Sequence, residues 1–216
     1  MTEEQWLACE NLRWLLSIPD ELKSVRKSRL ALCACARGQT FWPLLASRSS
    51  RRVVEVGEAF ADGATDKKAL RLAQSGASAA TGRGPRSSDH VAAELARVIG
   101  YQDSWLLRYG VHYFVNVAAR VHLALPARLA QDTHANPFRP VNFDAACLTA
   151  TVVALAQAAY DERALPSGHL DPARLAVLSD ALEEAGCVDA EVLDHLRSSG
   201  PHVRGCWALD LLLGKG

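Results

Sequence analysis

The sequence predicts an all-α protein of about nine or ten short helices packed as an irregular bundle. Apolar residues recur at helical spacing along most of the chain, and residues that cap helices stand where these stretches begin. The alternating pattern that is typical of strands is almost absent. With 216 residues, the chain is long enough to bury one sizeable core, or to form two small helical subdomains that share an interface.

The N-terminal part contains signals for four helices. Thr2 and Gln5 have the spacing of a capping box and open the first helix. The segment 24–35 is basic at its start and apolar afterwards, which predicts a helix with an exposed first turn and a buried remainder. Residues 48–62 repeat apolar positions at helical spacing, and a weaker helical pattern follows in 66–80.

The middle of the chain begins with its only stretch of linker composition. The residues GRGPRSS (82–88) predict a loop. A helix is expected over 89–99 and a long one over 104–125, where Pro126 either kinks the helix or opens a new one.

The C-terminal part has clearer helix boundaries. Thr149 caps a helix, and Asp171 is an N-cap directly ahead of a proline. The helix that begins after Asp171 is expected to end just before Gly186, because glycine is favoured at the position that follows a helix. A short helix is expected over 189–197, and the last one over 201–214. We therefore divide the chain into an N-terminal helical region (1–81), variable middle helices (82–135) and a C-terminal motif region (136–216), which together form one compact domain.

Several motifs resemble those of a family of uncharacterised bacterial helical proteins. They are MTEEQWLAC and RKSRLALCACAR near the N-terminus, and NPFRPV, DALEEAGC and PHVRGCWALDLLLGK near the C-terminus. The matches cover about residues 1–70 and 136–216, whereas the middle departs from the family pattern. The resemblance implies a bacterial helical protein and carries no activity with it.

Composition argues against several classes of partner. The 24 basic residues balance the 24 acidic ones, so no net charge attracts nucleic acid or an anionic membrane. No uncharged apolar run approaches the roughly 18 residues that span a bilayer, and the N-terminus has no basic segment typical of a signal peptide. We therefore expect a soluble, cytoplasmic protein with no membrane or nucleic-acid partner, although Arg48, Arg51 and Arg52 leave phosphate binding open as an alternative.

The six cysteines fit a reducing compartment. Cys33 and Cys35 lie inside an apolar run, two residues apart, and in a helix such a pair points to different faces. Because an apolar setting raises the pKa of a thiol and makes it unreactive, we expect all six cysteines to be packed thiols.

A metal site is the main chemical alternative. Cys187, His195, His202 and Cys206 supply donors that zinc accepts, and the last two are four residues apart on one face of the expected final helix. However, the set contains no CxxC pair, and its spacings match no established zinc pattern. We therefore expect no cofactor, and keep zinc bound by these four residues, in a metal-dependent or thiol enzyme, as the alternative.

The final helix contains a carboxylate on an apolar side. Asp210 follows Trp207 by three residues, so it should be buried and should need a partner. The sequence suggests Arg139 of NPFRPV, or Arg204, as the residue that pairs with it. Such a pair would form a structural lock between NPFRPV and the final helix.

No catalytic motif is present, and no catalytic residue is assigned: the chain contains no G-x-S-x-G, no HExxH and no P-loop. We therefore expect a non-catalytic helical module that binds an unidentified protein or acts as a scaffold. Aromatic side chains are the candidates for its contact surface. They are Trp6, Trp14, Trp105 and Tyr109.

Overall fold

The computed structural model describes residues 2–10, 24–78, 88–120, 127–139, 141 and 143–215. Within these ranges it contains eleven α-helices, one short 3-10 helix and only isolated β-bridges, which confirms the all-α prediction. The α-helices are α1 (Glu3–Leu7), α3 (Val25–Arg37), α4 (Arg48–Ala61), α5 (Lys67–Ser78), α6 (Ser88–Ile99), α7 (Ser104–Arg120), α8 (Ala127–Thr133), α9 (Ala150–Asp161), α10 (Pro172–Glu184), α11 (Ala190–Arg197) and α12 (Trp207–Leu212). The 3-10 helix η2 (Ala145–Cys147) precedes α9.

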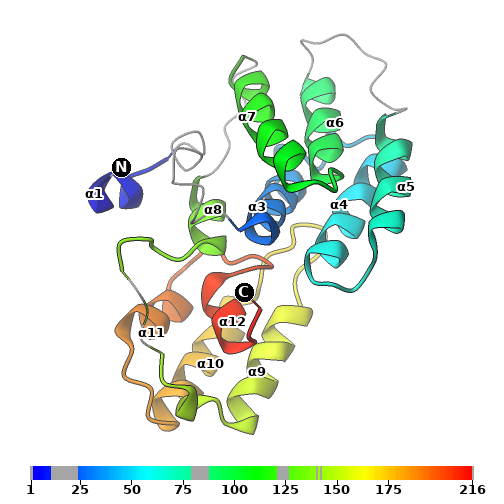
Figure 1. The fold of residues 1–216 in the computed structure, drawn as a ribbon. Helices are drawn as coiled ribbons and strands as arrows, with labels where there is room; N and C mark the ends of the chain where they lie inside the picture. Colours follow the sequence, from blue (N-terminus) through cyan, green and yellow to red (C-terminus); the bar gives the residue numbers. More distant parts are fainter. Residues whose placement is uncertain are drawn as a thin grey trace.

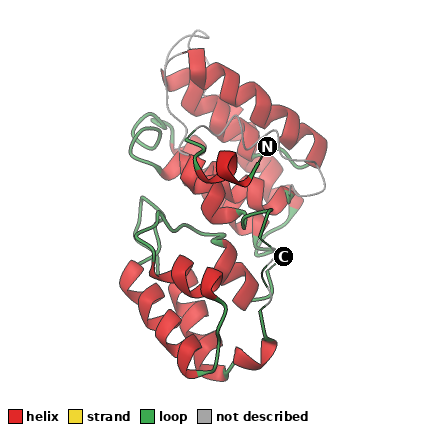
Figure 2. Ribbon diagram, turned by 90° about the vertical axis from the view of Figure 1, so that its left-hand side faces the viewer, coloured by secondary structure: helices red, strands yellow, loops and turns green. Residues whose placement is uncertain are grey.

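The helices form two lobes, each with a hydrophobic cluster of its own (Figures 1 and 2). The N-terminal lobe contains α3 to α8, so the expected middle helices share one core with the N-terminal ones. The C-terminal lobe contains α9 to α12. Helix α3 is central to the first lobe, where it packs against α4, α6, α7 and α8.

The capping signals at Thr2 and Asp171 and the helix-end glycine Gly186 are confirmed. The Thr2 hydroxyl accepts the backbone N–H of Gln5, and the Gln5 side chain completes the capping box. Asp171 accepts the N–H of Ala173 at the start of α10, and Gly186 follows this helix with a φ of +90°. These short-range contacts need nothing from the rest of the fold.

The last helix starts later than predicted. It begins at Trp207 rather than near Pro201, and the residues between them form turns. Gly205 adopts a φ of +89°, and a Cβ atom there would lie 2.6 Å from the Leu30 side chain. The positive φ favours glycine and interrupts the helix at this point, and the packing of α3 against the turn is a tertiary contact.

Asp210 is buried as predicted, with 2% of its surface exposed, but its partner is Arg26. The Arg26 guanidinium donates to both carboxylate oxygens, at 3.0 Å for Nη2 to Oδ1. The same group also donates to Asp62 at 2.9 Å and to the Tyr160 hydroxyl at 3.0 Å. Burial raises the pKa of Asp210, and the contact with Arg26 offsets only part of that effect. This network joins α3 to the C-terminal lobe.

The two arginines suggested as partners of Asp210 pair elsewhere. Arg204 donates from Nε to Asp62 Oδ2 at 2.6 Å. Arg139 pairs with Glu3 and Glu191, and 49% of its side chain is exposed. The predicted partners were therefore wrong. The expected exposed first turn of the segment 24–35 was wrong too, because Arg26 there lies in a network of acceptors and Arg29 donates to the Tyr101 carbonyl at 2.7 Å.

A second buried network lies around Glu58 of α4. Its two oxygens accept from Arg37 of α3 at 2.6 and 2.9 Å. They also accept from Arg163, which follows α9, at 2.9 and 2.6 Å. Burial by itself raises the pKa of Glu58, but the two guanidinium groups outweigh it and hold that pKa below its ordinary value. Glu58 therefore connects the two lobes through paired charges.

The cysteines are thiols in the structure, and all six are buried. Burial raises the pKa of Cys35 to about 12, which agrees with the prediction of an unreactive packed residue. In the described part of the chain, no helix combines the length and the apolar character that crossing a membrane requires.

Candidate metal centre

Four side chains with metal-binding atoms meet where the two lobes join. They are Asp132 of α8, His195 of α11, and His202 and Cys206 of the turns before α12. Their donor atoms all lie within 4.8 Å of one another. Asp132, His202 and Cys206 are buried, whereas the His195 side chain keeps 19% of its surface exposed, toward a cleft.

Each side chain is held by the packing of its own segment. Leu129 and Ala130 of α8 belong to the N-terminal core, which fixes Asp132 at the edge of that lobe. Val192 and Leu196 of α11 belong to the C-terminal core, so His195 faces the junction from the other side. The site therefore draws its ligands from both lobes.

Backbone hydrogen bonds fix the turn that contains His202. The N–H of Val203 donates to Asp132 Oδ2 at 2.8 Å, and the His202 carbonyl accepts the N–H of Leu170 at 2.9 Å. The Asp132 carboxylate thus directs one oxygen to the backbone of the turn and leaves the other, Oδ1, toward the two histidines.

The distances between donor atoms are close to those around a tetrahedral ion. His202 Nδ1 lies 2.9 Å from Asp132 Oδ1, and His195 Nε2 lies 3.2 Å from the same oxygen. His195 Nε2 is also 3.2 Å from Cys206 Sγ. Zinc bonds of about 2.0–2.3 Å place neighbouring ligand atoms roughly 3.3–3.8 Å apart, so a small outward movement of these side chains makes room for an ion.

The outer nitrogens of both histidines have partners. His202 Nε2 lies 3.1 Å from the Ser198 carbonyl, which accepts a hydrogen bond from it. His195 Nδ1 lies 3.2 Å from Nε1 of Trp207. The indole N–H can only donate, so this contact puts the proton of a neutral His195 on Nε2. An ion bound at Nε2 requires the proton on Nδ1 instead, and the Trp207 contact must then rearrange.

The pKa values of the cluster residues are set by burial and by their contacts with one another. Burial alone lowers the pKa of His202, but the hydrogen bond and the charge of Asp132 outweigh it, and the net pKa is raised. Burial alone raises the pKa of Asp132, but the hydrogen bonds from His195 and His202 bring the net pKa below its ordinary value. Burial raises the pKa of Cys206 well above that of a free thiol. Without an ion, Cys206 therefore stays protonated.

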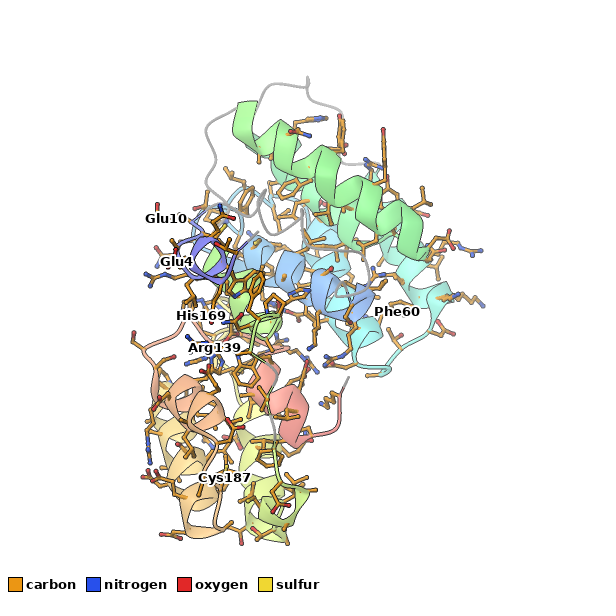
Figure 3. All side chains as sticks on the ribbon, turned by 60° about the vertical axis from the view of Figure 1, so that its left-hand side comes forward. Glu4, Glu10, Phe60, Arg139, His169 and Cys187 are labelled. Carbon is orange, nitrogen blue, oxygen red and sulfur yellow. The ribbon has the colours of Figure 1, made fainter. Side chains whose placement is uncertain are left out.

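Three of the four metal ligands suggested by the sequence come together, and one does not. Cys187 lies inside the C-terminal lobe (Figure 3). Its thiol contacts that of Cys147. Asp132 takes its place, and it lies 70 residues before His202. No short sequence motif predicts Asp132 as a metal ligand, because its position next to the histidines depends on how α8 packs against the other lobe.

The other predicted sites are dispersed. Trp6 is buried in the N-terminal core, whereas Tyr109 on α7 is 62% exposed. Trp14 and the side chain of Trp105 lie outside the described residues. Arg52 pairs with Glu55 at 3.1 Å, and the Arg51 guanidinium lies over the ring of Trp42 at 5.3 Å.

No protein-family model, curated protein or solved structure matches the chain, so the resemblance to a bacterial family stays a prediction.

Proposed function

We propose that this protein is a non-catalytic helical module whose two lobes are held together by one zinc ion. The ligands of the ion are Asp132, His195, His202 and Cys206. The observation that supports this proposal is the convergence of the four donor atoms within 4.8 Å, from three separate segments of the chain.

The donor set favours zinc. One thiolate, two imidazoles and one carboxylate form a mixed set of the kind that zinc binds tetrahedrally. The positive ion would lower the pKa of the Cys206 thiol, since metal binding competes with the proton for this ligand. It would also neutralise the buried negative charges of Asp132 and Cys206.

The site favours a structural role over a catalytic one. Four protein ligands complete a tetrahedron and leave no position for water or substrate. Cys206 is fully buried, and its raised pKa argues against a nucleophilic thiol. An enzyme that uses this cluster is therefore the less favoured alternative.

Elemental analysis tests the proposal on protein purified without chelator. We expect about one zinc per chain, because each chain supplies one complete set of four ligands. The measurement should be made near pH 7.5, where protons compete weakly with the ion. Wild-type protein that contains no metal, and that takes up none when zinc is added, would overturn the proposal.

A role in binding another protein is the second part of the proposal, and two tyrosines support it. Tyr109 and Tyr113 stand one helical turn apart on α7, with 62% and 44% of their surfaces exposed. Tyrosine is enriched among the residues that dominate the energy of protein interfaces. The pair takes the place of Trp6, which is almost fully buried and offers little surface to another protein.

The double variant Tyr109→Ser/Tyr113→Ser tests this surface. We expect the melting temperature of the double variant to be close to that of the wild type. We also expect it to fail to capture the proteins that the wild-type chain captures specifically from an extract. The control is Leu72→Ser, which changes an apolar side chain that is 67% exposed on α5. If the double variant and the control capture the same proteins as the wild type, the tyrosine pair is not a contact surface.

A further inference from the structure

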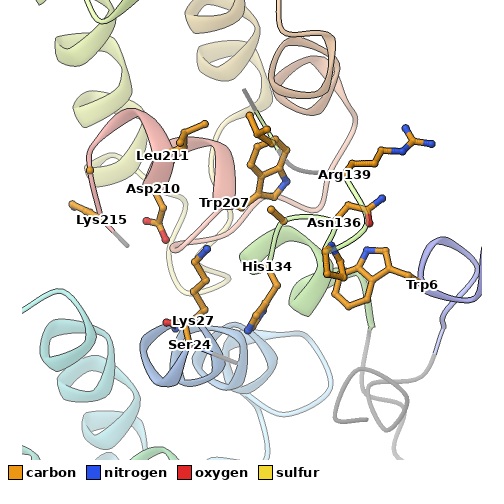
Figure 4. A pocket seen from close by; sticks show the side chains of 14 residues that line it. Trp6, Ser24, Lys27, His134, Asn136, Arg139, Trp207, Asp210, Leu211 and Lys215 are labelled. Carbon is orange, nitrogen blue, oxygen red and sulfur yellow. Dashed lines mark hydrogen bonds between the residues drawn. The ribbon is translucent and has the colours of Figure 1, made fainter. Parts of the chain in front are cut away.

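A cleft of about 570 Å³ lies between the lobes, with Trp207 in its wall (Figure 4). Its walls come from both lobes and from α1. The N-terminal lobe contributes Lys27, the C-terminal lobe contributes Trp207 and Asp210, and α1 contributes Trp6. Small-molecule sites in proteins have volumes of roughly 300–1,000 Å³, so this cleft has the size of a ligand site.

The lining of the cleft divides into an aromatic part and a charged part. Figure 4 shows the indoles of Trp6 and Trp207 at one end, and the ammonium group of Lys27 directed toward Asp210 and the interior at the other. Such an arrangement suits a ligand with an apolar body and one polar group.

The charged part carries a surplus of positive charge. Both oxygens of Asp210 accept from Arg26, so its single negative charge is shared between that guanidinium and the nearby Lys27 ammonium. Lys215, whose ammonium lies 3.6 Å from the centre of the Tyr160 ring, adds a second cation to the lining. Burial lowers the pKa of Lys27, and the attraction of Asp210 offsets only part of that effect.

The neutral state of His134 keeps the apolar side of the cleft uncharged. Burial lowers the pKa of His134 to about 4, so the ring is neutral at pH 7. Its Nδ1 lies 3.0 Å from the Ala130 carbonyl, which holds the ring in place against the wall. A ligand therefore meets one cationic end and one uncharged end.

We propose that this cleft binds a small organic anion, a carboxylate with a flat apolar body. Its carboxylate pairs with the ammonium group of Lys27, and its body packs against Trp6 and Trp207. None of the four metal ligands contributes to the lining of this cleft, and Trp207 of the lining contacts one of them, His195.

Indole-3-acetate, benzoate and hexanoate, each compared with its neutral amide, test the proposal by titration of the full-length protein. Binding is measured by calorimetry and by the shift of the Trp207 indole N–H signal in NMR spectra. We expect indole-3-acetate or benzoate to bind saturably and more tightly than hexanoate, whose body is not flat. The amide of the bound acid should bind at least tenfold more weakly, because a charged hydrogen bond contributes about a tenfold to hundredfold change in affinity.

Variants of Lys27 show whether its positive charge, and not only the size of its side chain, is needed to bind the acid. Lys27→Met should weaken binding of the acid at least tenfold, whereas Lys27→Arg should retain it. The control is Lys68→Met, an exposed lysine on α5, which should bind as the wild type does. The comparison of acid with amide on the wild type still decides the question if Lys27→Met fails to fold. The proposal is overturned if no acid binds below about 10 mM, or if acid and amide bind equally.

Discussion

Zinc added to the metal-free protein should raise its melting temperature by roughly 10 °C. An ion that binds only the folded state stabilises it by about 4 kcal/mol at a concentration a thousandfold above its dissociation constant. In a domain of this size each kcal/mol corresponds to about 2–4 °C. The effect is large because the ligands lie on both lobes, so that the ion opposes their separation as well as local unfolding.

Two cysteine variants distinguish the metal site from ordinary packing. Cys206→Ala removes a ligand and should abolish the rise in melting temperature. Cys187→Ala removes an equally buried thiol outside the cluster, and should lower stability somewhat while keeping the full response to zinc. A wild type whose melting temperature does not respond to zinc, or a Cys206→Ala variant that still responds fully, would contradict the site.

The pH dependence of stability should have opposite signs with and without the ion. The raised pKa of His202 stabilises the metal-free protein fully below about pH 6.5, and this contribution is lost as pH rises through the raised value. Zinc competes with protons for the imidazoles and the thiol, so its stabilisation fades as pH falls. The difference in melting temperature between the two forms should therefore grow from pH 5.5 to pH 8.

Glu58→Gln should lower the free energy of unfolding by about 3 kcal/mol, the scale on which a buried ion pair responds to the loss of one partner. The amide keeps the shape of the side chain but leaves the guanidinium groups of Arg37 and Arg163 without their shared carboxylate. Denaturant unfolding measures the loss. The pKa of Glu58 is lowered in the folded protein. Its contribution to the free energy of unfolding is therefore fully present when the pH is above the ordinary pKa of a glutamate, and it is lost as the pH falls through the lowered pKa.

The matched control is Glu55→Gln, one turn earlier on the same helix. Glu55 pairs with Arg52 on the surface, where 49% of the Glu55 side chain and 66% of the Arg52 side chain are exposed. Such pairs contribute about 0–1 kcal/mol, so this variant should unfold nearly as the wild type does. Equal stabilities for the two variants would show that the Glu58 network does not hold the lobes together.

The elements that were predicted correctly are those defined by short-range contacts. The Asp171 cap, the turn at Gly186 and the buried apolar run of α3 depend on residues within a few positions of one another. The burial of Asp210 was also predictable, because its helix is apolar on the side where it lies. The predicted final helix failed at its start, where Gly205 adopts a positive φ in a turn that packs against Leu30, far away in the sequence.

The sequence by itself determined the helical class, most helix boundaries and the residue types available for a metal site. Only the tertiary structure decided which of them meet: Asp132 replaced Cys187 in the cluster, and Arg26 replaced Arg139 and Arg204 at Asp210. The physical reason is one of range. Capping and amphipathic patterns act over one or two turns, whereas a buried charge or a set of ligands is satisfied by whichever group the packing of the two lobes brings within about 3 Å.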